Sequence, residues 1–149
     1  VCIASDHAGF NLKEIIKDHL IDKHVSIFDL GPYKNKSVDY PDYAKRLAKR
    51  VKDKKSDIGI LVCGSGTGMA ISANKIKDIR AAVCYNQKST RLSRQHNNAN
   101  IIALGSRLTK KSLSLKLVEL FVKIIPPLGP LKTLCVVEVT TSAYLVGLG

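Results

Sequence analysis

The stretch IGILVCGSGTG, at residues 58–68, decides the fold class of this chain. It begins with an apolar run of the length expected for a strand that is buried on both faces, as strands of parallel sheets are. Glycines at alternate positions follow. They are typical of a tight turn that leads from a strand into a helix and brings backbone N–H groups close to a ligand. The stretch therefore predicts a strand–turn–helix unit of an α/β protein.

The same alternation extends in both directions along the chain. Short apolar runs predict strands at residues 1–5, 25–29, 58–63, 81–85 and 100–104. Amphipathic segments predict helices at residues 10–23, 43–53, 67–76, 88–96 and 109–123. Strands that alternate with helices in this way favour a parallel sheet covered on both faces. We therefore predict an α/β fold, a three-layer α/β/α sandwich around a five-stranded, parallel, Rossmann-like sheet.

Composition limits the class of protein. With 149 residues, 45% of them apolar, the chain has the size and core of one domain. The net charge of +12 suits nucleic acid, but the lysines are scattered over predicted helices with few aromatic residues among them. We expect neither nucleic acid nor membrane as a partner, since charges and prolines interrupt the apolar region after residue 113. No basic and apolar leader opens the sequence, so we expect a cytoplasmic protein.

Four cysteines, at positions 2, 63, 84 and 135, form no CxxC pair and have no metal-ligand spacing, so we expect free thiols and no metal. Cys63 differs from the others because a glycine-rich helix start follows it directly. Such a helix start stabilises a thiolate, which acts as a nucleophile or as a proton-transferring base. The alternative is a small buried residue at a strand end, and the local sequence does not separate the two. Dinucleotide binding is disfavoured, because Cys84, not an acid, lies twenty residues after Gly64.

Polar residues follow other predicted strands. Ligands of open parallel sheets bind at the carboxyl ends of the strands, so we expect Asp6, His7 and Arg107 at that edge. We place His96 and Asn97, which close the helix before the fifth strand, at the same edge. The remaining histidines, at positions 19 and 24, are expected to be incidental surface residues.

Five motifs resemble, in order and spacing, those of the ribose-5-phosphate isomerase type B family. They are SDHAG at residues 5–9, VDYP at 38–41, CGSGTGM at 63–69 with ANK at 73–75, LSRQHN at 92–97, and GSR at 105–107. The resemblance covers residues 1–122 and implies that they form a sugar-phosphate isomerase domain. Galactose-6-phosphate and allose-6-phosphate isomerases share this fold and are close alternatives.

The resemblance implies an aldose–ketose isomerase of the pentose phosphate pathway that interconverts ribose 5-phosphate and ribulose 5-phosphate through an enediolate. The implied catalytic residues are Cys63 as base, Ser65 beside the enediolate, Asp6 on the sugar hydroxyls, and His96 as the acid that opens the furanose. The implied substrate-binding residues are Gly64, Gly66, Thr67 and Gly68 by their backbone, Tyr40 and Asn97 as pocket lining, and His7 and Arg107 at the phosphate. The family uses no metal or organic cofactor. It forms homodimers or tetramers, in which His96 and Asn97 reach the Cys63 loop of the partner subunit.

Residues 123–149 depart from the family, which carries a Gly-Gly-Arg-His stretch and a further arginine in its tail. The only charged residues of this segment are Lys123, Lys132 and Glu138. We interpret it as an atypical apolar tail rather than a separate domain, either divergent or used as an added strand for assembly. Two alternatives to the pentose phosphate isomerase stay open: a hexose-6-phosphate isomerase on the same scaffold, and a non-catalytic phosphosugar-binding protein, which the tail makes possible.

Overall fold

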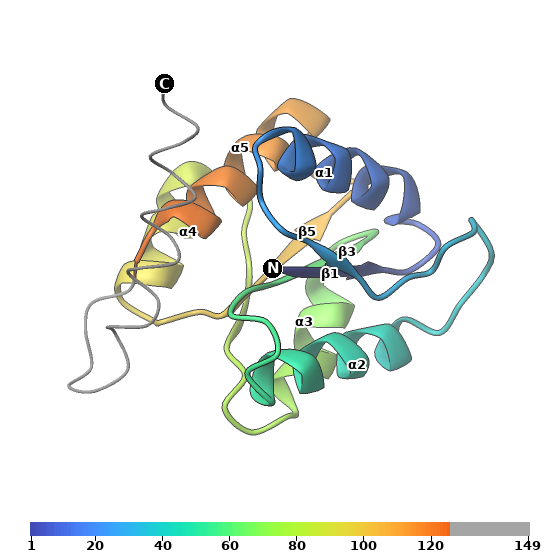
Figure 1. Cartoon of the computed structure of the whole chain (residues 1–149), viewed down its shortest axis with the longest axis horizontal. Helices are drawn as coiled ribbons and strands as arrows, with labels where there is room; N and C mark the ends of the chain where they lie inside the picture. The colour runs from blue at the N-terminus through green and yellow to red at the C-terminus, as the bar shows by residue number, and fades with distance from the viewer. Residues whose placement is uncertain (126–149) are drawn as a thin grey trace.

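A computed structural model describes residues 1–125 of the chain as a parallel sheet with helices on both faces (Figure 1). In chain order the elements are β1 (Cys2–Ser5), α1 (Phe10–Asp22), β2 (Phe28–Asp29), α2 (Tyr40–Lys52), β3 (Gly59–Cys63), α3 (Thr67–Asn74), β4 (Ala81–Val83), α4 (Gln87–Gln95), β5 (Ile101–Gly105) and α5 (Lys111–Lys123). The strands are parallel and lie in the order β2-β1-β3-β5-β4. The predicted α/β fold with a five-stranded parallel sheet is confirmed. The interpretation of the tail falls, from residue 126 on, outside the described residues.

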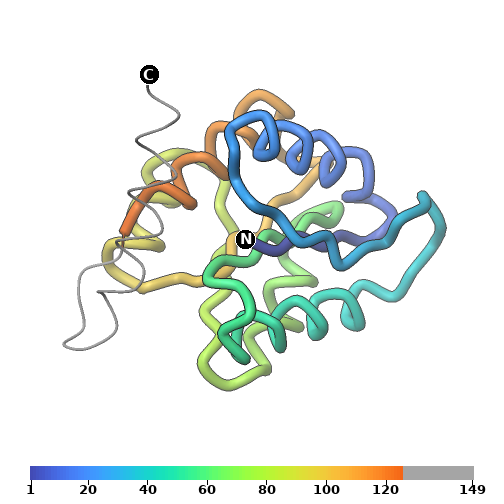
Figure 2. The backbone as a smooth tube through the Cα atoms, in the orientation of Figure 1, coloured from blue at the N-terminus to red at the C-terminus, as the bar shows by residue number. Residues whose placement is uncertain are grey.

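Each face of the sheet has its own core. Along β3, Ile60 and Val62 point into one cluster of buried residues, and Leu61 and Cys63 point into the other, because successive side chains of a strand face opposite sides. Helices α1 and α5 cover the first face, with α4 beside α5, and α2 and α3 cover the second (Figures 1 and 2). These are the three predicted layers. Within residues 1–125, no helix has the length and apolar composition needed to span a membrane.

The edge strands are shorter than the sequence predicts. Strand β2 pairs with β1 only through Phe28 and Asp29, because the chain is still turning before them and the Val25 N–H bonds back to the Leu20 carbonyl at 2.9 Å. Strand β4 ends at Val83 rather than at residue 85. Helix α2 begins at Tyr40, three residues earlier than predicted, with Pro41 in its first turn. Proline is tolerated there because the first N–H groups of a helix have no partner inside the helix.

Candidate active site

Three loops meet at the carboxyl edge of the sheet, after its three central strands β1, β3 and β5. The Asp6 N–H donates to the Val62 carbonyl at 3.1 Å, which ties the loop after β1 to the end of β3. The Ser106 N–H donates to the Cys63 carbonyl at 2.8 Å, and the Ser106 hydroxyl donates to the Ala8 carbonyl at 2.8 Å. The loop after β5 is thereby bonded to both others, so side chains from three distant parts of the sequence are held in one place.

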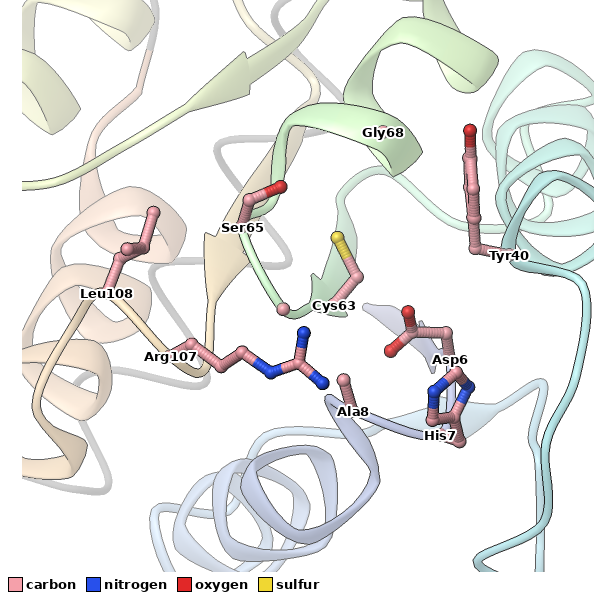
Figure 3. A pocket seen from close by; sticks show the side chains of 10 residues that line it. Asp6, His7, Ala8, Tyr40, Cys63, Ser65, Gly68, Arg107 and Leu108 are labelled. Carbon is pink, nitrogen blue, oxygen red and sulfur yellow. The ribbon is translucent and has the colours of Figure 1, made fainter.

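The loop after β1 approaches β3 so closely that only glycine fits at position 9. A Cβ there would lie 2.2 Å from the carbonyl oxygen of Val62. The Gly9 N–H donates to the carboxylate of Asp6 at 2.9 Å, which fixes the orientation of that nearly buried side chain. The carboxylate lies at the carboxyl edge of the sheet, on the side that faces Cys63 (Figure 3).

The thiol of Cys63 lies at the N-terminus of α3. Its Sγ accepts a hydrogen bond from the Gly66 N–H at 3.0 Å. Gly66 is the N-cap of α3 and has a left-handed backbone (φ 80°), a conformation that favours glycine. The Ser65 hydroxyl accepts from the Thr67 N–H at 3.3 Å in the same turn. The Cys63 sulfur thus faces a hydrogen-bond donor at the positive end of a helix.

The other two cysteines of the described chain lie in different surroundings. Cys2 and Cys84 are buried, and burial raises the pKa of both thiols above its ordinary value. Cys63 is buried as well and packs in the core cluster of the α2 and α3 face, but its sulfur points into a pocket (Figure 3). This placement fits both alternatives that the sequence left open, and the reactive role of the thiol stays a prediction.

This pocket, of about 360 Å³, is lined by Asp6, His7, Ala8, Tyr40, Cys63, Gly64, Ser65, Gly68, Arg107 and Leu108. The guanidinium of Arg107 extends over Gly64, where an added Cβ would lie 3.1 Å from Nη1, and it points toward the centre of the group (Figure 3). The Arg107 N–H donates to the Gly64 carbonyl at 3.0 Å, which fixes the base of this side chain. A cation, a carboxylate and a thiol thus converge on one cavity that is suited to a small polar anion.

The structure brings together most of the residues that the sequence predicted for this site. Gly66 and Thr67 stand behind the pocket lining, where their N–H groups bond to Cys63 and Ser65. Ala8 and Leu108 line the pocket without having been predicted. The available signal was that Ala8 lies within the SDHAG motif and that Leu108 directly follows the GSR motif. Within residues 1–125, no group of three or more His, Cys, Asp and Glu side chains is arranged to hold a metal ion.

The expected placement of His96 and Asn97 at the carboxyl edge is wrong for a single chain. Helix α4 starts after the carboxyl end of β4 and runs back, so its end delivers the chain to the amino end of β5 (Figure 2). The Asn100 carbonyl accepts from the N–H of Gly59, the first residue of β3, at 3.0 Å. Neither residue lines the Cys63 pocket. Asn97 instead borders a second cavity of about 460 Å³, together with Asn74, Ile79, Arg80, Ala81, Ala82, Ser93 and Ala99.

Fold and site together define a class. The protein is an open, doubly wound α/β protein whose ligand pocket lies at the carboxyl edge of the sheet and contains a thiol at a helix start. Its sequence matches the profile of the Ribose/Galactose Isomerase family over residues 1–126. The chain belongs to this family.

Relatives and solved structures agree with this assignment. The chain is 45% identical over 125 residues to the probable ribose-5-phosphate isomerase B of Mycoplasma genitalium, covering 83% of this chain and 82% of the relative. It is 42% identical over 119 residues to ribose-5-phosphate isomerase B of Escherichia coli strain K12, covering 80% of each. Ribose-5-phosphate isomerase B of Clostridium thermocellum superimposes with a TM-score of 0.84 at 41% identity, over 99% of this chain and 94% of that one. The Mycoplasma genitalium enzyme with bound ribulose-5-phosphate superimposes with a TM-score of 0.81 at 39% identity, over 96% and 95%.

Proposed function

We propose that this protein is an aldose–ketose isomerase that interconverts D-ribose 5-phosphate and D-ribulose 5-phosphate, with Cys63 as the base. The observation that carries the proposal is the position of the Cys63 sulfur, which faces the pocket and accepts the Gly66 N–H at 3.0 Å. The relatives named above as ribose-5-phosphate isomerase B, one of them with ribulose-5-phosphate bound, supply the substrate class. Pentose phosphate metabolism follows as the pathway.

The proposed reaction moves one proton between two carbons. The Cys63 thiolate removes the C2 proton of open-chain ribose 5-phosphate, and the electron pair forms the C1–C2 double bond of an enediolate. Ser65 and the backbone N–H groups of residues 64–68 stabilise the negative oxygen. The thiol then delivers the proton to C1, while the hydroxyl proton on O2 passes to O1 and leaves a ketone at C2. Because every step is a proton transfer, the mechanism requires no cofactor.

Three further side chains bind the substrate in this proposal. Asp6, held by the Gly9 N–H, accepts hydrogen bonds from sugar hydroxyls. Arg107 and His7, which both line the pocket (Figure 3), bind the phosphate, because a guanidinium forms paired, charge-assisted hydrogen bonds with phosphate oxygens. Tyr40, whose ring lies over Gly68 at the start of α3, lines the pocket wall.

The second half of the proposed site comes from another copy of the chain. His96, as the acid that opens the furanose ring, and Asn97 lie at the amino edge of the sheet, away from the Cys63 pocket of their own chain. A homodimer whose two-fold axis sets the amino edge of one subunit against the carboxyl edge of the other would complete both sites at once. Large exposed apolar side chains on and near α3 and α4 support such an interface: Ile71, Tyr85 and Leu92. We propose the cytoplasm as the compartment, since it keeps the thiol reduced.

Purified protein incubated with ribose 5-phosphate tests the activity, and allose 6-phosphate and galactose 6-phosphate are the comparison substrates. We expect the highest kcat/KM for ribose 5-phosphate. The appearance of ribulose 5-phosphate in the NMR spectrum measures the reaction. Preference for a hexose 6-phosphate would favour the alternative isomerase on the same scaffold. Binding of all three sugar phosphates without turnover would make the protein a phosphosugar-binding protein.

Subunit mixing tests the shared site. A Cys63→Ala subunit and a His96→Ala subunit are each impaired, but a heterodimer of the two contains one site with both side chains intact. We expect mixtures to recover up to about half of the sites in their heterodimers. An absence of recovery, after mass spectrometry has verified subunit exchange, would show that each site is built within one chain.

A further inference from the structure

The turn that carries His96 and Asn97 is held by arginine side chains from two directions. On the inner side, Arg94 Nη1 donates to the Ala99 carbonyl at 2.5 Å. Its Nε donates to the carbonyl of Ile124, the residue directly after α5, at 3.1 Å. One guanidinium therefore joins the end of α4, the following turn and the end of α5.

Arg94 is buried, with 6% of its surface exposed. Within residues 1–125 no carboxylate forms an ion pair with it; its partners are two carbonyls and the ring of Phe121, whose centre lies 4.9 Å from the guanidinium carbon. Burial lowers the pKa of Arg94 to about 10, so the side chain stays charged at neutral pH. Burying an unpaired cation is costly. An apolar residue would fill the same space without this cost, so the hydrogen bonds to the turn are what the charge provides.

On the outer side, Arg80 holds the same turn. Its Nε donates to the Asn97 carbonyl, and its backbone N–H donates to the Asn100 side chain at 2.9 Å. Asn98, between the two gripped carbonyls of Asn97 and Ala99, has a left-handed backbone (φ 48°). Asparagine adopts this conformation more readily than most residues, and the arginine bonds to the carbonyls on either side of Asn98 hold the turn directly after His96.

We propose that Arg94 and Arg80 are positioning residues that set the placement of His96 and Asn97 for the active site. This inference rests on the proposed function, in which His96 opens the furanose ring. A planar guanidinium with donors in fixed directions holds a carbonyl in one place, which the flexible ammonium of a lysine does not. The two arginines touch no reacting atom. They act through the turn.

The test separates ring opening from enediolate chemistry. Turnover of ribose 5-phosphate, which is mainly a furanose, needs both steps. Exchange of the C1 proton of ribulose 5-phosphate with D₂O needs only the enediolate, because this ketose cannot close a furanose when its C5 oxygen carries the phosphate. For Arg94→Met and Arg80→Met we expect turnover of ribose 5-phosphate to fall by up to about 100-fold, as for a catalytic group displaced by roughly 1 Å. The C1 exchange should stay near that of the unchanged protein.

Arg50→Met is the matched control. Arg50 stacks over the ring of Phe28 at 3.6 Å and donates to the Ser56 hydroxyl at 3.0 Å, so its loss costs similar contacts without touching the turn. It should leave both rates unchanged. Arg80 is exposed, so Arg80→Met keeps the test available if Arg94→Met does not fold. Equal losses of turnover and exchange in folded dimers, or the same selective loss in Arg50→Met, would overturn the proposal.

His96→Ala distinguishes a failure of the positioning role from a failure of the proposed function. If His96→Ala lowers turnover and exchange equally, the ring-opening role of His96 is wrong. The NMR signals of the isotope-labelled His96 ring then test the positioning role independently of activity. Shifted or broadened signals in Arg94→Met and Arg80→Met, but not in Arg50→Met, would support it. Unchanged signals would refute it.

Discussion

The carboxyl edge and the amino edge of the same sheet are built differently. At the carboxyl edge, loops after β1, β3 and β5 are bonded to one another, and Asp6, Cys63 and Arg107 converge on one pocket. At the amino edge, a single turn after α4 carries His96 and Asn97 beside a cavity that contains no acid, thiol or histidine. The comparison places the residues of the proposed site at opposite edges of one chain. In the proposed homodimer, a second copy of the chain completes the site.

The largest effect in this comparison is expected at the carboxyl edge. Replacing Cys63 by Ala should lower turnover by roughly 10²–10⁴, the contribution of a positioned acid–base group, and should also abolish C1 proton exchange. His96→Ala, at the other edge, should spare the exchange. Stopped assays for turnover and NMR for exchange measure the two. Cys84→Ala, which removes a buried thiol away from the pocket, is the control. Near-full turnover of Cys63→Ala would make Cys63 a structural residue.

A buried ion pair supports the carboxyl edge from behind, and its loss should be the next largest effect. The fully buried Lys13 donates to both oxygens of Asp29, at 2.9 and 2.7 Å, and Asp29 accepts the Gly31 N–H at 2.8 Å. The Gly31 carbonyl in turn accepts the N–H of Ser5, the residue before Asp6, at 3.1 Å. Lys13→Met should lower the free energy of unfolding by about 3 kcal/mol, the lower end for a broken buried pair, because Lys17 still bonds to Asp29.

Urea unfolding measures this change, and Lys17→Met is its control. Lys17 is partly exposed, so its loss should cost at most about 1 kcal/mol. If the two substitutions lowered the free energy of unfolding equally, the full burial of Lys13 would contribute no extra stability.

Phosphate binding sharpens the comparison further, because Arg107 is the cation that the carboxyl edge contributes to the pocket. Arg107→Met should raise the KM for ribose 5-phosphate by about 10- to 150-fold, the value of one charge-assisted hydrogen bond of roughly 1.5–3 kcal/mol. Turnover at saturating substrate should change less. Steady-state kinetics measures both constants, and Lys110→Met, an exposed cation three residues on, is the control. An unchanged KM would assign the phosphate to other cations, including those of a partner subunit.

The smallest effect concerns the α1 and α5 face, which belongs to neither edge. Burial by itself would raise the pKa of Glu119, but the hydrogen bond to His19 at 2.5 Å and the nearby Lys23 and Lys123 lower it below its ordinary value. A lowered carboxyl pKa stabilises the fold above the ordinary value, near 4.5, and this stabilisation disappears as the pH falls through the folded-state pKa.

Glu119→Gln should therefore lower the free energy of unfolding by less than about 1 kcal/mol at pH 7 and have no effect near pH 3. Urea unfolding of both proteins across this range is the measurement. A difference that persists at pH 3 would mean that packing, not charge, is responsible.

Much of the carboxyl edge could be predicted from the sequence. Short apolar runs, glycines at turns and the polar residues after strands are local signals, and they identified Asp6, Cys63 and Arg107 before any contact was known. Edge strands were predicted too long, because an apolar run can be longer than the part of it that pairs with a neighbouring strand. Val25, for example, belongs to such a run, but its N–H bonds back to the Leu20 carbonyl. The start of α2 was predicted three residues too late, because the apolar spacing that identified the helix begins only at Ala44.

The sequence by itself determined the alternation of strands and helices, the motif set and the chemistry of each loop, because these depend on residue types at short spacing. Only the tertiary structure decided that α4 carries His96 back to the amino edge, since this depends on the direction in which a helix crosses a parallel sheet. Only the structure showed that Arg94 and Arg80 grip that turn. Their partners are backbone carbonyls, which every residue carries, so no pattern of side chains in the sequence distinguishes these two arginines from the others.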